Sequence, residues 1–128
     1  MRDLVALRRF LEERAAVPFA WGRDANDCGA FVLDAVAAQT GRDPMRSRWT
    51  TMRGAARLIR KAGGMEALVN SLFRPIPVAR AMRGDIAGLP DGAFGILLMI
   101  VADSEQLVGP GDTRAPRSAM IRAWSVEA

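Results

Sequence analysis

The chain changes character about two-thirds of the way along its length. Its first 73 residues carry apolar side chains at helical spacing, whereas residues from 84 onward form short apolar runs separated by Pro, Gly and Asp. Between these parts, Arg74-Pro75-Ile76-Pro77 ends any helix because proline lacks an amide proton. Helices followed by strands favour an α+β fold, with N-terminal helices packed on a small antiparallel sheet. We predict a single domain over residues 1–128, helical at about 1–73 and stranded at about 84–126.

Apolar periodicity predicts four helices. They are expected over residues 3–16, over 28–40, from Thr50 or Thr51 to the Gly63-Gly64 pair, and over about 65–73. The first two helices can be capped by Asp3 and by Asn26 or Asp27, and Gly41 suits the left-handed end of the second. The residues expected to face inward on the third helix are Met52, Ala55, Ala56 and Ile59.

Four strands are predicted in the second part, over residues 85–89, 94–101, 106–108 and 121–126. Leu89-Pro90-Asp91-Gly92 is typical of a turn, since proline presets φ and Gly92 accepts a positive φ. Ala123-Trp124-Ser125-Val126 alternates as an edge or closing strand does.

The composition of the chain argues against several classes of function. The net charge is +4, and every one of the 18 basic residues except Lys61 is arginine. These charges are spread along the sequence, so we interpret them as compositional bias and expect no nucleic-acid partner. There is no histidine and only one cysteine, so neither a Cys/His metal site nor a cofactor is expected. No apolar run is long enough to span a membrane.

The segment from Phe19 to Val32 carries the candidate chemistry. Cys28 stands where the second helix is expected to begin, among backbone N–H groups that have no helical partner. Their partial positive charge favours thiolate over thiol, so a helix tip can present a nucleophile. The alternative is that Cys28 is a small apolar residue on the buried stripe of the helix.

The same segment resembles the nucleophile motif of NlpC-type, papain-like cysteine peptidases. The matching residues are Phe19, Trp21, Gly22, Asp27, Cys28, Gly29, Phe31 and Val32. Two later blocks are similar to the family's first core strands, namely Arg83-Gly84-Asp85-Ile86 and Phe94-Gly95-Ile96. The resemblance covers about residues 19–101 and implies a papain-like NlpC-type fold with Cys28 as a vestigial nucleophile.

The chain departs from this family at its general base. In the family a histidine stands two residues before the glycine of the second strand, and that position is Ala93 here. The group that orients the histidine would lie near Val108 or Gly109, and neither can do so. Alanine cannot hold a thiolate as an ion pair or protonate a leaving amine.

Carboxylates are the remaining candidates for an acid or base. Asp27 precedes Cys28, but its charge raises the thiol pKa and it only accepts hydrogen bonds at neutral pH. Asp85, Asp91 or Asp103 could approach Cys28, and one with a strongly raised pKa could act as a general acid.

Three further residues are candidates for binding. The resemblance implies that Trp21 and Gly22 shape a substrate groove, although Trp21 can equally pack against the second helix. Trp49 stands in the arginine-rich stretch Met45-Arg46-Ser47-Arg48-Trp49, where an exposed tryptophan suits a protein interface and a buried one would cover the core.

The carboxyl end and the third-helix region resemble a branch of this superfamily from tailed phages and prophages that often lacks the histidine. The resemblance implies a non-catalytic structural or assembly component of a phage tail tip, made in the bacterial host cytoplasm and carried in the virion. Its partners would be tail hub, tail-tip or fibre proteins. The alternative is an active cysteine endopeptidase or amidase that acts on cell-wall peptide, with Cys28 as nucleophile and a base supplied from elsewhere. A regulatory protein absent from the virion is a third possibility.

Overall fold

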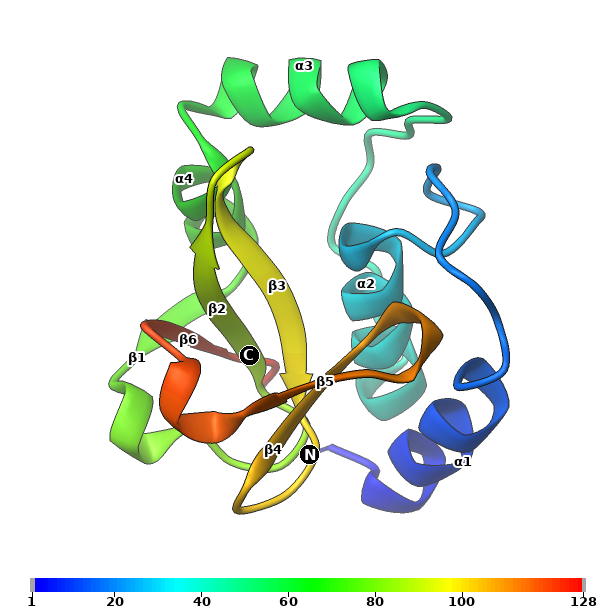
Figure 1. The fold of residues 1–128 in the computed structure, drawn as a ribbon, viewed down its shortest axis with the longest axis vertical. Coiled ribbons are helices and arrows are strands. Elements are labelled where there is room, and N and C mark those ends of the chain that lie inside the picture. Colours follow the sequence, from blue (N-terminus) through cyan, green and yellow to red (C-terminus); the bar gives the residue numbers. More distant parts are fainter. Residues whose placement is uncertain (1, 128) are drawn as a thin grey trace.

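The computed structural model describes residues 2–127 and combines helices with one antiparallel sheet (Figure 1), which confirms the predicted α+β class. The helices are α1 (Leu4–Arg14), α2 (Cys28–Thr40), α3 (Met52–Ala62) and α4 (Met65–Leu72). The strands are β1 (Arg74–Ile76), β2 (Ile86–Asp91), β3 (Gly95–Val101), β4 (Gln106–Gly109), β5 (Thr113–Pro116) and β6 (Arg122–Ser125).

The helix boundaries follow local capping. The side chains of Asp3, Asp27 and Thr51 each accept a backbone hydrogen bond from the first turn of their helix, at 2.8–3.0 Å. Gly41 and Gly63 end α2 and α3 with φ of 74° and 97°, which a residue with a Cβ adopts at a cost. These caps confirm the predicted starts of the first three helices and the predicted stops of α2 and α3, whereas α1 ends at Arg14, two residues earlier than predicted.

The six strands described form one sheet in the order β1-β6-β2-β3-β4-β5, with every neighbouring pair antiparallel. Helices α1, α2 and α4 cover one face of it. The core on this face is completed by the strand residues Ile86, Ile96, Leu98, Ile100, Val108 and Trp124. The opposite face buries Ala87, Leu89, Met99, Val101, Leu107 and Ala123 beneath Ala81 and Met120. Both faces are therefore apolar and covered.

Two strands were not predicted from the sequence, and a third is placed differently from the prediction. Residues 74–76, predicted only to end a helix, pair with β6, and residues 113–116 pair with β4. Both lie at the edges of the sheet, where proline is tolerated. The carboxyl-terminal strand β6 is not at an edge but lies between β1 and β2, and Trp124 on it is 1% exposed.

The turn between β2 and β3 also differs from the prediction. Pro90 and Asp91 pair with β3 and so belong to β2, and the turn follows at residues 92–94. The positive φ falls on Gly95, at 81°, and not on Gly92. Met52 is a further correction, because this residue at the first position of α3 is 54% exposed and does not face the core.

Gly84 brings the strand part against α2. Its carbonyl accepts a hydrogen bond from Gln39 Nε2 at 3.0 Å, and its own φ is 93°. A methyl group at this position would overlap Gln39 Oε1. The glycine is therefore required both by its backbone conformation and by the close approach of α2.

We expect Gly84→Ala to lower the free energy of unfolding by more than about 2 kcal/mol, because it adds a steric overlap to the cost of a positive φ. The matched control is Gly41→Ala, which shares the positive φ but has no atom near the added methyl group, and which should cost about 1 kcal/mol. Chemical denaturation measures both. Equal losses would show that the contact with Gln39 does not matter.

Candidate functional site

The candidate site is built around the first turn of α2. Cys28 is the first residue of this helix and Asp27 is its N-cap. The loop before it is closed by two backbone hydrogen bonds between Ala20 and Asn26, at 2.9 and 3.3 Å. The segment therefore reaches the helix in a fixed conformation, and the position predicted for Cys28 at the helix tip is confirmed.

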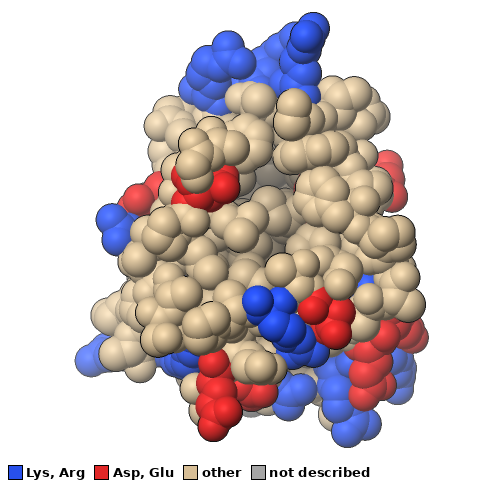
Figure 2. Space-filling view, in the orientation of Figure 1, with Lys and Arg blue, Asp and Glu red and all other residues tan. Residues whose placement is uncertain are grey.

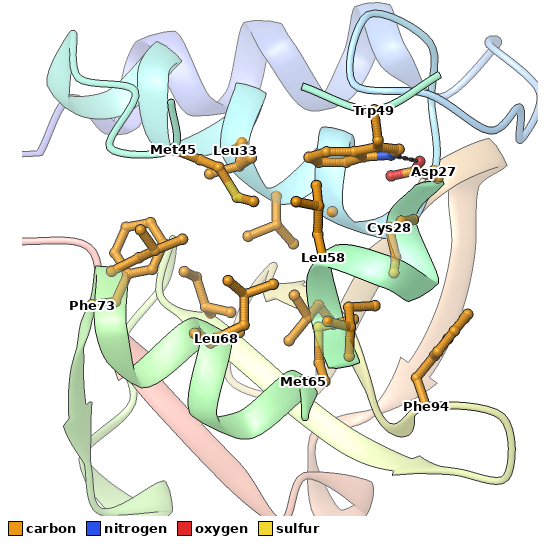
Figure 3. Close-up of a pocket in the computed structure, with 18 of the residues that line it drawn as sticks. Asp27, Cys28, Leu33, Met45, Trp49, Leu58, Met65, Leu68, Phe73 and Phe94 are labelled. Carbon is orange, nitrogen blue, oxygen red and sulfur yellow. Dashed lines mark hydrogen bonds between the residues drawn. The ribbon is translucent and has the colours of Figure 1, made fainter. Parts of the chain in front are cut away.

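Asp27 binds three separate parts of the chain. Its Oδ1 accepts from the amide of Ala30 at 2.8 Å, and its Oδ2 accepts from the amide of Gly22 at 2.9 Å and from Trp49 Nε1 at 2.7 Å (Figure 3). The side chain is buried, with 2% of the residue exposed. Its expected role as N-cap is confirmed, and its two oxygens are occupied by donors of the scaffold.

Gly22 allows two segments to meet beside the helix tip. It has a φ of 129°, and a Cβ built on it would lie 3.4 Å from the carbonyl oxygen of Thr50. The next amide, from Arg23, donates to the carbonyl of Trp49 at 2.9 Å. Gly22 is buried and does not line the cavity, whereas its neighbour Trp21 does.

The aromatic residues around the start of α2 differ in their exposure. Trp49 is 8% exposed, so the interpretation that it covers the core is correct and the exposed alternative is wrong. Trp21 is half-buried and makes edge-on contacts with Phe19 and Phe94, at centroid distances of 5.1 and 6.2 Å. The row Phe19–Trp21–Phe94 forms an aromatic rim beside the thiol.

Cys28 faces an apolar cavity of about 60 Å³. Figure 3 shows its side chain pointing into this space, and Figure 2 shows a hollow beneath α3. The cavity lies among α2, α3, α4 and the β2–β3 hairpin, with α3 across its top (Figure 1). Among its lining residues are Leu33, Met45, Leu58, Met65, Leu68, Phe73, Phe94 and Leu98. Only Asp27 and Cys28 of the lining carry a titratable side chain.

Burial raises the pKa of the Cys28 thiol above its ordinary value, and the charges of Asp27 and Asp91 act in the same direction. Hydrogen bonding from the backbone amides of Leu98 and Gly29 lowers the pKa, but it does not offset the burial. The helix tip therefore holds a neutral thiol at neutral pH. This is the opposite of the electrostatic activation expected from the helix terminus alone.

Ala93, the position of the missing histidine, does not line the cavity. It is exposed in the turn before β3, and side chains alternate along the strand that follows. Phe94 and Leu98 point to the helix-covered side and line the cavity with Cys28. Around the start of β3, Phe94 and Leu98 therefore share the cavity with Cys28, and Ala93 does not.

None of the three carboxylates considered as an acid or base lines the cavity. Asp91 accepts from the amide of Phe94 at 2.9 Å within the turn, while Asp103 is exposed in the β3–β4 loop. Asp85 is buried in an ion pair with Arg2 at 2.8 Å. Val108, near the expected orienting group, is an apolar core residue.

An ion-pair network that the sequence analysis missed holds the loops around the site. The buried guanidinium of Arg23 pairs with Asp34 at 2.8 Å and with Asp43 at 3.1 Å. Arg14 also pairs with Asp34, and Arg48 with Asp43. The only available signal was a set of opposite charges on segments that lie far apart in sequence. The network joins the loop before α2 to the loop before α3.

No cation site stands out at these carboxylates. Across residues 2–127 there is no group of three or more Cys, Asp or Glu side chains arranged to hold a metal ion. Over the same residues, no helix has the length and apolar character needed to cross a bilayer.

The site and fold define an α+β protein with a protonated cysteine at a helix tip, facing an apolar cavity. Residues 3–126 match the family model described as Domain of unknown function (DUF6950), and the chain therefore belongs to that family. A comparison with curated protein sequences found no match.

We expect Asp27→Asn to lower the free energy of unfolding by about 2–3 kcal/mol, because an amide NH₂ would face buried donors where an oxygen now accepts. Trp49 fluorescence and chemical denaturation measure the effect. Asp24→Asn removes an exposed charge from the same loop and is the control; a similar loss there would contradict the role assigned to Asp27.

Alkylation of Cys28 should follow a pH profile whose midpoint lies above the usual thiol value of about 8.5. A raised pKa reduces the thiolate fraction at neutral pH, so the reaction speeds up only in more alkaline solution. The control is the same chain unfolded in guanidinium, whose profile should have an ordinary midpoint. A folded-state midpoint below the unfolded one would show an activated thiol.

Proposed function

We propose that this chain is a non-catalytic, NlpC-like domain with a papain-like fold that acts through protein–protein contacts. The order of its elements supports this: a capped helix that begins with Cys28 packs on an antiparallel sheet whose β2 strand directly follows the Gly84-Asp85 segment. The three segments that carry the resemblance lie at the start of this helix and at the starts of β2 and β3. The fold class is α+β, and the papain-like assignment is part of the proposal.

The proposal rests on one observation: the thiol faces apolar groups where a cysteine peptidase needs a base. Phe94 and Leu98 line the cavity with Cys28, and neither can accept or donate a proton. The raised pKa of the thiol removes the remaining route, a thiolate stabilised by the helix alone. Nucleophilic attack would need a thiolate, and departure of an amine would need a proton donor. The cavity supplies neither group.

The side chains of the motif around the thiol stabilise the fold rather than contact a substrate. Asp27 is used to join three segments, and Trp49 is used to cover the core. Neither side chain is free to orient a substrate. What the motif maintains is the geometry of the helix tip and its loops.

We propose a phage tail tip as the setting, on the strength of the resemblance to the phage and prophage branch. The partners would be tail hub, tail-tip or fibre proteins, and the chain would be carried in the virion after synthesis in the host cytoplasm. A domain without turnover suits this role because assembly needs a stable surface and no reaction.

The alternative is an active endopeptidase or amidase on cell-wall peptide. One observation favours it: the Cys28 side chain points into a hollow at a helix tip (Figure 3), where a substrate carbonyl would approach a nucleophile. It would require a base from another subunit, together with a shift of Phe94 away from the thiol.

Purified protein incubated with peptidoglycan should release no more peptide than buffer does, and Cys28→Ser should behave identically. Released fragments are measured by chromatography with mass spectrometry. Because a partner could supply the base, the assay is repeated with virions of the phage or prophage that encodes the chain. Cleavage that disappears in Cys28→Ser would overturn the proposal.

The matching genetic experiment places Cys28→Ala in that phage. We expect particles that assemble and infect at the normal level, since the substitution removes only a half-buried thiol beside a cavity. Mass spectrometry of purified particles should detect the chain. Its absence from particles would favour the regulatory alternative over a tail component.

A further inference from the structure

The positive charge of this protein is concentrated in one segment. Six of the 18 basic residues lie between Pro44 and Met65, and none of the 14 acidic residues does. The rest of the chain therefore carries 12 basic and 14 acidic residues and is slightly acidic. The net positive charge of the protein therefore comes from this segment, which contains α3, although basic residues also occur elsewhere in the chain.

The outer face of α3 displays these charges. Arg53, Arg57, Arg60 and Lys61 are exposed. Arg57 lies four residues after Arg53, and Arg60 and Lys61 lie three and four residues after Arg57, which places all four on one side of the helix. With a rise of 1.5 Å per residue, this basic face is about 12 Å long. Figure 2 shows the blue side chains at the α3 end of the molecule with no acidic side chain beside them.

The opposite side of α3 fixes the orientation of the basic face. Ala55 and Ile59 are buried, and Leu58 lines the cavity beneath the helix. Thr51 and Gly63 cap the two ends. The helix therefore cannot rotate to bury its cations, and among residues 2–127 none of the four makes an ion pair.

The arrangement is unfavourable for an isolated helix. Arg53 and Arg57, and then Arg57 and Lys61, are like charges four residues apart, which repel each other. Arg53 also lies in the first turn, where the helix dipole disfavours a cation. A helix needed only to cover the cavity would be more stable with acidic residues at some of these positions.

We infer that the basic face of α3 is an interaction surface for a carboxylate-rich protein segment. Arginine binds carboxylates through two parallel hydrogen bonds, and three of the four cations are arginine. The inference deepens the proposed function and rests on it for the class of partner.

The basic face of α3 is less suited to nucleic acids and to anionic membranes than to a carboxylate-rich segment. A long nucleic acid or an anionic membrane would extend past a face of about 12 Å onto a remainder that is slightly acidic. The exposed side of α3 also lacks an aromatic side chain for base stacking, and its apolar side is already buried in the fold. A short acidic segment meets only the basic face.

The test uses a labelled peptide of about a dozen glutamates and the full chain, with binding followed by fluorescence anisotropy at low salt. The test variant is Arg53→Gln with Arg57→Gln and Arg60→Gln. The control removes the same charge elsewhere through Arg9→Gln, Arg74→Gln and Arg80→Gln, all exposed. We expect roughly tenfold weaker binding for the test variant and a change within about twofold for the control.

Three results would overturn the inference. These are no binding of the peptide by the unaltered chain, equal weakening in both variants, and tighter binding of duplex DNA or anionic vesicles than of the peptide. None of these measurements involves Cys28. Catalysis found at that residue would refute the proposed function and leave the charge measurement intact, so the two failures are distinguishable.

Discussion

The Asp27 carboxylate is the contact on which the geometry of the helix tip depends. It accepts the Ala30 amide in α2, the Gly22 amide in the preceding loop and the Trp49 indole in the loop before α3. Three segments that are separate in sequence thus share one buried anion. A buried carboxylate is tolerated because three donors replace the water it loses. The same charge opposes ionisation of its neighbour Cys28, so stabilising this scaffold works against a reactive thiol.

Features fixed by neighbouring residues could be predicted from the sequence. The caps at Asp3, Asp27 and Thr51, and the glycine that ends α2, each depend on a few adjacent positions. The place of Cys28 at the helix tip followed from them. These local signals were enough to predict the helices of the N-terminal part and the α+β class.

Features fixed by pairing across the chain could not be predicted. β1 and β5 contain prolines and become strands because edge positions leave part of their backbone unpaired. Which residues beside the β2–β3 turn face the cavity depends on where that turn closes, because one residue of slippage moves every side chain to the other face. The buried Arg23 network depends on contacts with Asp34 and Asp43, which no local pattern indicates.

Helix α3 has an apolar inner side and a basic outer side. The reactivity of Cys28 and the binding of a charged partner therefore depend on different sides of this helix. Its inner side, with Leu58 and Ile59, borders the cavity that Cys28 faces, so it contributes to the apolar surroundings that keep the thiol protonated. Its outer side, with Arg53 and Arg57, is directed to solvent. Chemistry at Cys28 therefore depends on what lies beneath α3, and recognition of a charged partner depends on what lies above it.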